Sequence, residues 1–300
     1  AVIGGIMEHI EAAGVHSGDS ACVLPPYTLG PDMLEEISNA TKAMAHELNV
    51  VGLMNVQYAI KDNRLFVIEV NPRASRTIPF VSKATGIPLA KVATKVMLGR
   101  TLEELGIVEQ VVPEYISIKE AVLPFDRFPD VDTLLGPEMK STGEVMGIVS
   151  HFGGAYAKAQ LGAGMKLPTR GTVFISVKDS EKPAVLPVAD QFHMIGFGIM
   201  STSGTSAFLS ENGFPNTSVT KVSMGRPHVV DAIKNGTIQS IINTGTGDTS
   251  KRDGYHIRRS ALKFNIPYAT TISGAKAMCR GVTALRDKEL NVKTIQAYHR

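Results

Sequence analysis

The hydrophobic pattern of the first half of the chain changes its period several times. Residues 31–48 carry apolar side chains at helical spacing and begin with a proline, so they predict an amphipathic helix. Two apolar runs, 56–60 and 65–70, flank the turn-forming sequence Lys-Asp-Asn-Arg and predict a β-hairpin. The other elements expected here are a strand at 1–6, helices at 89–98 and 152–161, and short strands within 113–150.

The second half of the chain alternates between strand and helix patterns. Strands are expected at 172–177, 197–201, 238–243 and 267–271, and helices at 183–195, 206–211, 228–234, 251–264 and 275–285. This alternation is typical of a small parallel sheet with helices on both faces, which binds ligands at the C-terminal ends of its strands. Gly162-Ala163-Gly164 is a candidate linker, so we expect two units, 1–164 and 165–300.

Composition narrows the class of protein. A chain of 300 residues suggests about two domains, and 43% hydrophobic with 20% charged residues is ordinary globular composition. The formal net charge of +3 is too small to imply nucleic acid as a partner. No apolar run approaches the roughly 20 residues that span a bilayer, so no membrane partner is expected. Two cysteines, Cys22 and Cys279, favour a reducing, cytoplasmic setting over a disulfide framework.

The predicted hairpin carries the residues with the clearest chemistry. Glu69 and Asn71 are two apart in a strand and therefore share one face. If the loop is the three residues 62–64, Gln57 lies directly opposite Glu69. One carboxylate with two amide oxygens suits Mg²⁺ or Mn²⁺, and two nearby arginines, Arg73 and Arg76, suit phosphate or carboxylate oxygens. The alternative is a plain hairpin in which the acid and the arginines pair at the surface.

At these residues the sequence resembles a known family. The segments IEVNPRASRTIPFVSKATGIPLAKVA and GGIMEHIEAAGVHSGDSACVLPP, followed in order by LPFDRFPDVDTLLGPEMKSTGEVMGI and VSMGRPHVVDAIKNG, are similar to the large chain of carbamoyl-phosphate synthases. The resemblance spans essentially all residues and implies an α/β and α+β chain. It would comprise the C-terminal part of an ATP-grasp domain and then a methylglyoxal synthase-like, Rossmann-type parallel α/β domain. We expect the upstream half of the ATP-grasp fold to precede Ala1.

The family resemblance also implies an activity. It is the Mg²⁺- or Mn²⁺-dependent phosphorylation of carbamate by ATP to carbamoyl phosphate, for arginine and pyrimidine synthesis, with K⁺ as a further candidate cofactor. The implied partner is a small glutaminase subunit. Because the upstream half supplies part of the nucleotide site, this chain alone is expected to be inactive and to bind ATP poorly.

Roles in phosphoryl transfer are carried over residue by residue. The resemblance makes Glu69 the bridging metal ligand, with Asn71 and Gln57 completing the metal and phosphate shell, and it assigns carbamate and the transferring phosphoryl group to Arg73 and Arg76. The family's GVHS segment near the nucleotide matches Gly14, Val15, His16 and Ser17. Its role is expected to be carried largely by the backbone, although His16 as an acid or base is an alternative.

The second unit resembles a domain that binds nucleotide monophosphates such as UMP or IMP. Thr202 and Thr205 lie between a predicted strand and helix, where hydroxyls and helix N-terminal amides can bind phosphate. Further matches to ligand positions of the family are Lys182, Lys221 and Asn243. One match fails, because the family's Thr-Thr is Thr244-Gly245 here, which leaves the nucleotide open. The alternative for the threonines is a helix cap.

The resemblance implies a second effector site between the units, for the activator ornithine. Its matching positions are Glu11, Asp19, Glu120, Tyr268 and Thr270. Acidic side chains can pair with ornithine's ammonium groups, and a ligand that contacts both units supplies the differential contact that coupling requires. The alternative is that each acid is a solvated surface charge.

Two competing functions follow from the same residues. The chain could be a purely regulatory polypeptide whose first unit only docks partners, although five intact site residues in the hairpin motif disfavour this. The second unit could instead be a lyase acting on a triose phosphate. That chemistry needs a carboxylate base, for which Asp248 is the only evident candidate.

Overall fold

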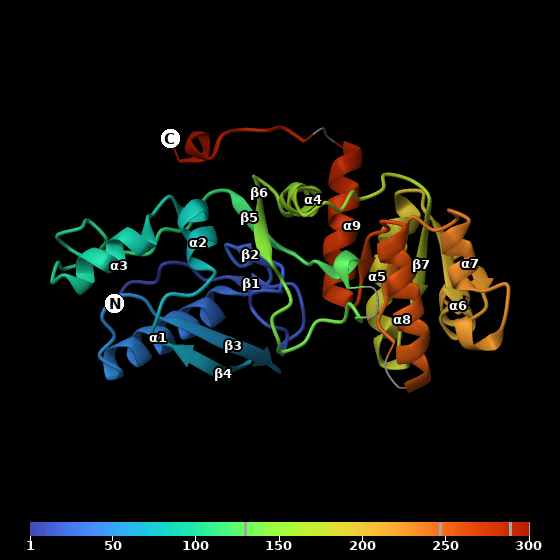
Figure 1. Ribbon diagram of the computed structural model, residues 1–300, viewed down its shortest axis with the longest axis horizontal. Helices are drawn as coiled ribbons and strands as arrows, with labels where there is room; N and C mark the ends of the chain where they lie inside the picture. The colour runs from blue at the N-terminus through green and yellow to red at the C-terminus, as the bar shows by residue number, and fades with distance from the viewer. Residues whose placement is uncertain (129–130, 246–247, 288–289, 300) are drawn as a thin grey trace.

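The computed structural model describes residues 1–128, 131–245, 248–287 and 290–299, and for 248–251 it describes the backbone alone. Figure 1 shows the two units side by side, with the parallel sheet of the second unit at one end of the molecule and the hairpin of the first unit toward the other. None of the helices in these ranges has the length and apolar character that crossing a membrane requires.

An antiparallel sheet organises the first unit. Its strand order is β1-β2-β5-β6, with β1 at Glu8–His9, β2 at Cys22–Leu24, β5 at Ile116–Val122 and β6 at Gly143–Val149. Helix α4, Phe152–Gly162, packs directly on β6, because Gly147 lets the backbone of Ala155 approach. The strand predicted at residues 1–6 is wrong. In the described part of the chain this apolar run has no strand to pair with and stays irregular.

Three helices surround this sheet and the hairpin. They are α1 (Pro31–Glu47), α2 (Ile78–Thr85) and α3 (Leu89–Met97). The first and third confirm the helical spacing read from the sequence. Helix α2 was not predicted, because its eight residues are too few to show a period. It is held instead by burying Phe80, Val81 and Ala84.

The hairpin consists of β3, Asn55–Lys61, and β4, Arg64–Asn71. Its loop is two residues long, Asp62 and Asn63, which have φ of 51° and 55° as a tight mirror-image turn requires. The predicted three-residue loop is therefore wrong. The register nevertheless shifts by one between Gln57 and Tyr58, so that β4 carries a β-bulge at Ile68.

The second unit is built on a parallel sheet of five strands, as predicted. Its order is β11-β10-β7-β8-β9, with β7 at Thr172–Ser176, β8 at Gly198–Thr202, β9 at Thr217–Val219, β10 at Ser240–Asn243 and β11 at Tyr268–Ala269. The helices are α5 (Lys182–Met194), α6 (Ser203–Glu211), α7 (Val229–Lys234), α8 (Asp248–Lys263) and α9 (Ile272–Asp287). One sheet face buries Ile175 against α5 and α9, and the other buries Phe174 against α7 and α8.

One hydrophobic cluster joins the two units. The cluster that includes Ile118 of β5 and Phe152 of α4 continues without a break into Val173 of β7 and Ala275 of α9. Small residues permit this contact, because a β-carbon at Gly153 of α4 would overlap a backbone carbonyl of α9. Figure 1 shows α4 against α9 between the two sheets. The predicted boundary at residue 164 thus separates two sheets, but one of the hydrophobic clusters of the described residues runs across it.

The chain ends by returning to the first unit. A short 3₁₀ turn, Ile295–Tyr298, places the Tyr298 hydroxyl to donate to Ile148 O of β6 at 3.0 Å. The next residue, His299, lies with Nε2 2.6 Å from Lys83 O in the last turn of α2. The end of the second unit is therefore fastened to the helix that follows the predicted catalytic arginines (Figure 1).

Candidate functional site

The hairpin brings together the predicted metal ligands. Gln57 lies directly opposite Glu69, and Asn55 lies opposite Asn71, so these four side chains occupy one face, which we call the hairpin face. The predicted pairing of Gln57 with Glu69 is confirmed. It arises from a two-residue turn plus the bulge at Ile68, since an unbroken ladder from that turn would set Glu69 opposite Val56 and on the other face. Asn55 was missed, although it stands two residues before Gln57.

Hydrogen bonds already order the outer end of the hairpin face. Asn71 Nδ2 donates to Glu69 Oε1 at 2.9 Å, and Arg73 Nη2 donates to Asn71 Oδ1 at 3.3 Å. Among the described ion pairs, Glu69 joins neither Arg73 nor Arg76. The surface ion pair considered as the alternative is therefore not formed, and the exposed Arg76 side chain faces solvent.

The donors on the hairpin face fit a hard divalent cation. One carboxylate with amide oxygens is the ligand type that Mg²⁺ and Mn²⁺ accept while keeping sites for water and phosphate. In the described ranges no three His, Cys, Asp or Glu side chains gather as a metal-binding group, so a cation here would need oxygen from amides and from a bound phosphate. The metal role of Gln57, Glu69 and Asn71 stays a prediction.

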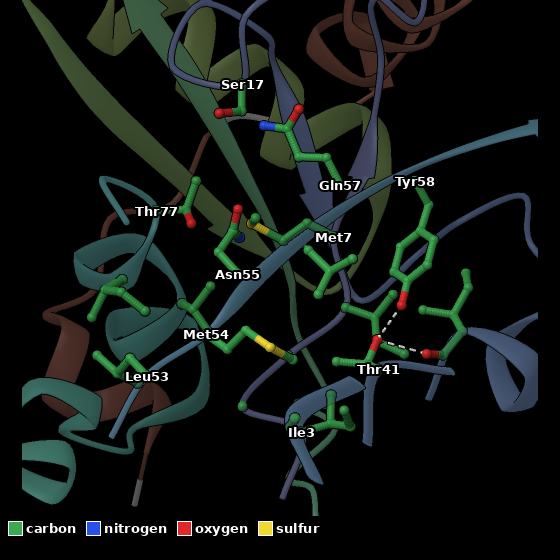
Figure 2. A pocket seen from close by; sticks show the side chains of 18 of the residues that line it. Ile3, Met7, Ser17, Thr41, Leu53, Met54, Asn55, Gln57, Tyr58 and Thr77 are labelled. Carbon is green, nitrogen blue, oxygen red and sulfur yellow. Dashed lines mark hydrogen bonds between the residues drawn. The ribbon is translucent and has the colours of Figure 1, made fainter. Parts of the chain in front are cut away.

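A large cavity lies beside the hairpin. It has a volume of about 870 Å³ and is lined by Asn55 and Gln57 of β3 together with Gly14, Val15 and Ser17 of the GVHS segment. Figure 2 shows the amide end of Gln57 pointing toward Ser17, with Asn55 and Thr77 also on the cavity wall. On another wall, the Tyr58 and Thr41 hydroxyls are hydrogen-bonded at 2.7 Å. The structure therefore brings three of the four predicted GVHS residues to the same cavity as Gln57.

The side chain of His16, the fourth GVHS residue, is used in a hydrogen bond to the backbone of its own loop. Its Nδ1 accepts from Gly18 N at 3.0 Å, which favours the backbone-shaping role over that of an acid or base. Sequence reasoning missed Lys119, which is fully buried on β5 and donates to Ser17 O at 3.1 Å and Gly18 O at 3.2 Å. A lysine in the middle of the apolar strand pattern 116–122 was the available signal.

Two of the predicted ornithine residues form an enclosed acid pair. Glu11 Oε2 accepts from Ser20 Oγ at 2.8 Å and from Ala21 N at 2.6 Å. Burial raises the pKa of Glu11, and burial together with the neighbouring Glu11 charge raises the pKa of Glu120 to about 8. Glu120 Oε2 is buried and has no hydrogen-bond partner among the described residues. The alternative of solvated surface charges is wrong for this pair.

The other three predicted ornithine residues lie in different surroundings. Asp19 is buried at 2% exposure, and its carboxylate accepts from Lys140 N at 2.7 Å and from Ser141 N at 2.9 Å. Burial raises the pKa of the Tyr268 hydroxyl, and a hydrogen bond with Thr133 of the first unit opposes this. Thr270 follows β11 and is half-buried. A shared ornithine site for all five residues stays a prediction.

The second unit contains a cavity of about 350 Å³ at the C-terminal ends of β7, β8 and β10, which we call the sheet-end cavity. All five residues predicted for nucleotide binding line it, namely Lys182, Thr202, Thr205, Lys221 and Asn243. Parallel strands end at the same edge of a sheet, which explains how positions so far apart in sequence converge. Their convergence is confirmed, while the ligand stays a prediction.

The hydroxyls of the sheet-end cavity are not used as helix caps. Thr202 precedes α6, yet its side chain makes no capping bond and instead shares a 2.9 Å hydrogen bond with Ser176 Oγ. Thr205 Oγ1 accepts from Val177 N at 3.3 Å. The helix-cap alternative is therefore wrong for Thr202, and the first amides of α6 stay available to a phosphate.

The sheet-end cavity is also lined by a Lys182–Asp179 ion pair and by the side-chain amide of Asn243. Lys182 Nζ lies 2.8 Å from the exposed carboxylate of Asp179, and Asn243 Nδ2 donates to Ser176 O at 3.3 Å. Within the described part of the chain, Asn243 Oδ1 is buried without a partner. Lining residues that the sequence did not single out are Ser176, Lys178, Asp179 and Asp253.

The chain departs from the family pattern at residues 244–246, of which the structure describes 244 and 245. Thr244 is buried, with its Oγ1 unpartnered among the described residues, and Gly245 lines the sheet-end cavity. Thr246, the next hydroxyl along the chain, lies outside the described residues. The same holds for the side chain of Asp248, the candidate base of the lyase alternative.

Comparison with known families agrees with the division of the chain into two units. Residues 1–105 match the family described as the carbamoyl-phosphate synthase L chain, ATP binding domain, and residues 184–270 match the MGS-like domain. The first match contains the GVHS segment and the hairpin. The second contains Thr202, Thr205 and Asn243 of the sheet-end cavity.

Individual proteins are similar over nearly the whole chain. Carbamoyl phosphate synthase large chains from Nostoc and Synechocystis are each 55% identical over 99% of this chain, and that of Archaeoglobus fulgidus is 54% identical over 99%. The chain spans only 27% of the length of the Nostoc protein and 28% of the other two.

Proposed function

Because the chain belongs to the carbamoyl phosphate synthase large chain family, we propose that it carries part of an ATP-dependent site that phosphorylates carbamate, together with an effector-binding unit. The observation that supports this most directly is the bulged register of the hairpin. It gathers Gln57, Glu69 and Asn71 on one face next to Arg73. Transfer of a phosphoryl group depends on positioning and charge neutralisation, and this set of groups can supply both.

Each group of the hairpin face has a proposed task. Glu69, Asn71 and Gln57 would hold Mg²⁺ or Mn²⁺, and a bound cation would neutralise charge on the phosphate oxygens. Arg73 and Arg76 would hold carbamate and the transferring phosphoryl group, as planar guanidinium groups suit such oxygens. The backbone of the GVHS segment would border the nucleotide. K⁺ stays a further candidate cofactor.

The test uses the full-length large chain with its glutaminase partner. Glu69→Ala or Asn71→Ala should abolish carbamate phosphorylation, measured as ATP formed from ADP and carbamoyl phosphate. The ATP hydrolysis that depends on bicarbonate should continue, because it belongs to a different site. Glu36→Ala, which removes an exposed acid of α1, is the matched control. Normal ATP formation by either site variant would remove the metal assignment. This chain alone should show neither turnover nor tight ATP binding.

We propose that the sheet-end cavity binds a nucleoside monophosphate, UMP or IMP. The phosphate would meet Lys182, Thr202 and Thr205 beside the first turn of α6, and Lys221 and Asn243 would bind further groups. The cavity volume of about 350 Å³ is at the small end of the range for such ligands. Binding there would modulate synthesis of carbamoyl phosphate for arginine and pyrimidine production in the cytoplasm.

The acid pair Glu11 and Glu120 supports a cationic effector, for which ornithine is the proposed ligand. Two enclosed acidic side chains, one with an unpartnered oxygen and a raised pKa, would be stabilised in their ionised form by an ammonium group. Glu120→Ala should weaken activation by ornithine without changing the basal rate, measured as the ornithine concentration for half-maximal activation. Unchanged activation would count against this site.

The rival function is a regulatory polypeptide whose first unit only docks partners. The hairpin face argues against it, because the bulge, the Asn71 to Glu69 hydrogen bond and the adjacent arginines have no evident purpose in a docking surface. The lyase alternative would be tested by assaying methylglyoxal release from a triose phosphate.

A further inference from the structure

We propose that residues 131–141, which we call the connecting loop, transmit occupancy of the sheet-end cavity to the GVHS segment, with the Arg258–Asp132 ion pair as the link. This proposal rests on the proposed nucleotide binding and names the route by which it would act. Arg258 belongs to α8 of the second unit, and Asp132 belongs to the first unit.

The first step of the route lies at Gly254 of α8, which Asn243 and Arg258 both approach. Gly254 lines the sheet-end cavity. A β-carbon there would lie 2.6 Å from Arg258 Nη1 and 3.0 Å from Asn243 Oδ1, so both atoms approach the same point of the helix. Asn243 Oδ1 is the buried acceptor without a described partner, and Nη1 is the guanidinium nitrogen that does not bond to Asp132. A ligand that reorients the Asn243 amide therefore changes the surroundings of Arg258.

The second contact is the ion pair itself. Arg258 Nε donates to Asp132 Oδ1 at 2.9 Å, and Nη2 donates to Oδ2 at 2.7 Å, which is a bidentate geometry. Only 2% of Arg258 is exposed. Burial tends to raise the pKa of Asp132, but the hydrogen bond and charge of Arg258 outweigh it and lower the pKa. A buried guanidinium without its carboxylate is strongly unfavourable, so the two groups move together or not at all.

The third contact joins the connecting loop to the GVHS segment. Gly136 O accepts from His16 N at 2.8 Å. Farther along, the amides of Lys140 and Ser141 both donate to the Asp19 carboxylate. Lys140 Nζ also donates to Leu134 O at 2.8 Å, which ties the two ends of the loop to each other. A displacement of Asp132 would therefore reach the backbone on either side of Ser17, where we place the nucleotide.

The experiment compares variants of the full-length large chain with its glutaminase subunit. Asp132→Asn keeps the shape of the side chain and removes its charge. Asp126→Asn is the control, because Asp126 is an exposed acid just before the connecting loop. Two quantities are measured: the Kd of UMP and of IMP, and the ratio of the ATP KM with and without saturating nucleotide.

We expect Asp132→Asn to bind nucleotide within about two-fold of wild type and to keep its basal kcat. Allosteric coupling is typically about 5- to 150-fold, and in this variant the KM ratio should fall to within about two-fold of one. A merely structural role would lower the basal kcat instead. Should Asp132→Asn fail to fold, the paired variant Arg258→Met/Asp132→Leu replaces both charges by apolar groups, so that the buried position of Arg258 no longer holds an unpaired charge.

Different results would overturn the route through the ion pair and the proposed nucleotide binding in the sheet-end cavity. A wild-type enzyme that binds neither UMP nor IMP would overturn the effector role of the sheet-end cavity, and the route with it. Variants that bind nucleotide normally and retain the full KM ratio would overturn the route alone. Loss of the ratio in the Asp126→Asn control would also overturn it, because the effect would then not belong to the ion pair.

Discussion

Replacing Glu120 by glutamine should flatten the pH dependence of folding stability. Glutamine keeps the size of the side chain and resembles the protonated acid. In the folded protein, burial and the nearby Glu11 raise the pKa of Glu120 from 4.5 to about 8. Between these values the folded state keeps a proton that the unfolded chain releases. The contribution of Glu120 to folding stability is therefore fully present below about pH 4.5 and is lost as the pH rises toward 8.

The size of the change in slope follows from a single proton, which the folded state holds on Glu120 and the unfolded chain releases. A difference of one bound proton between the folded and unfolded states changes the free energy of unfolding by about 1.4 kcal/mol for each pH unit. The wild-type curve should thus fall more steeply than that of Glu120→Gln, by up to this amount per unit in the middle of the window. Glu11 shares the cluster and contributes in the same direction, because burial raises its pKa too.

Urea unfolding of the chain at about pH 5.5, 6.5 and 7.5 measures these slopes. Glu36→Gln, a change at an exposed acid of α1, should leave the slope at the wild-type value. Parallel curves for wild type and Glu120→Gln would show that Glu120 is ionised in the folded protein at these pH values. The acid pair would then not be enclosed as we describe.

Two further changes test the packing between the units. Gly153→Ala should cost about 1–3 kcal/mol in the free energy of unfolding, because its β-carbon would overlap rigid backbone of α9. Gly162→Ala, which would meet only a valine side chain at 3.3 Å, is the matched control in the same helix, and equal losses would refute the close approach. Tyr298→Phe removes the hydroxyl that bonds to β6 and should cost about 1 kcal/mol in the free energy of unfolding, measured by urea titration. No change would mean that the Tyr298 hydroxyl does not bond to β6.

The sequence predicted most of the secondary structure and the convergence of the sheet-end residues. The elements follow from the hydrophobic period, whereas Lys182, Lys221 and Asn243 were assigned to one site by the family resemblance. The common edge of parallel strands is the physical reason why the structure brings them together. The hairpin is the instructive exception. The pairing of Gln57 with Glu69 was expected from a three-residue loop, but it comes from a shorter loop and a bulge. A bulge depends on how the strand meets its surroundings, which local pattern does not encode.

What the sequence could not provide were contacts between distant segments. Arg258 and Asp132 are separated by 126 positions, and nothing in either neighbourhood marks them as partners. Lys119 was not singled out from the sequence, and it is buried because two carbonyl oxygens of a loop about a hundred residues earlier accept from it. Helix α2 likewise exists because Phe80 and Val81 find a tertiary partner, not because its own sequence repeats.

The glycine contact between α4 and α9 has a consequence for how such a protein can evolve. A unit that could be exchanged freely between proteins would need a closed surface of its own, whereas the last long helix of the second unit packs closely against Gly153 of the neighbouring unit. Recombination that cut the chain at residue 164 would leave both halves with exposed apolar surface. A successful transplant of the second unit would have to carry α4 with it.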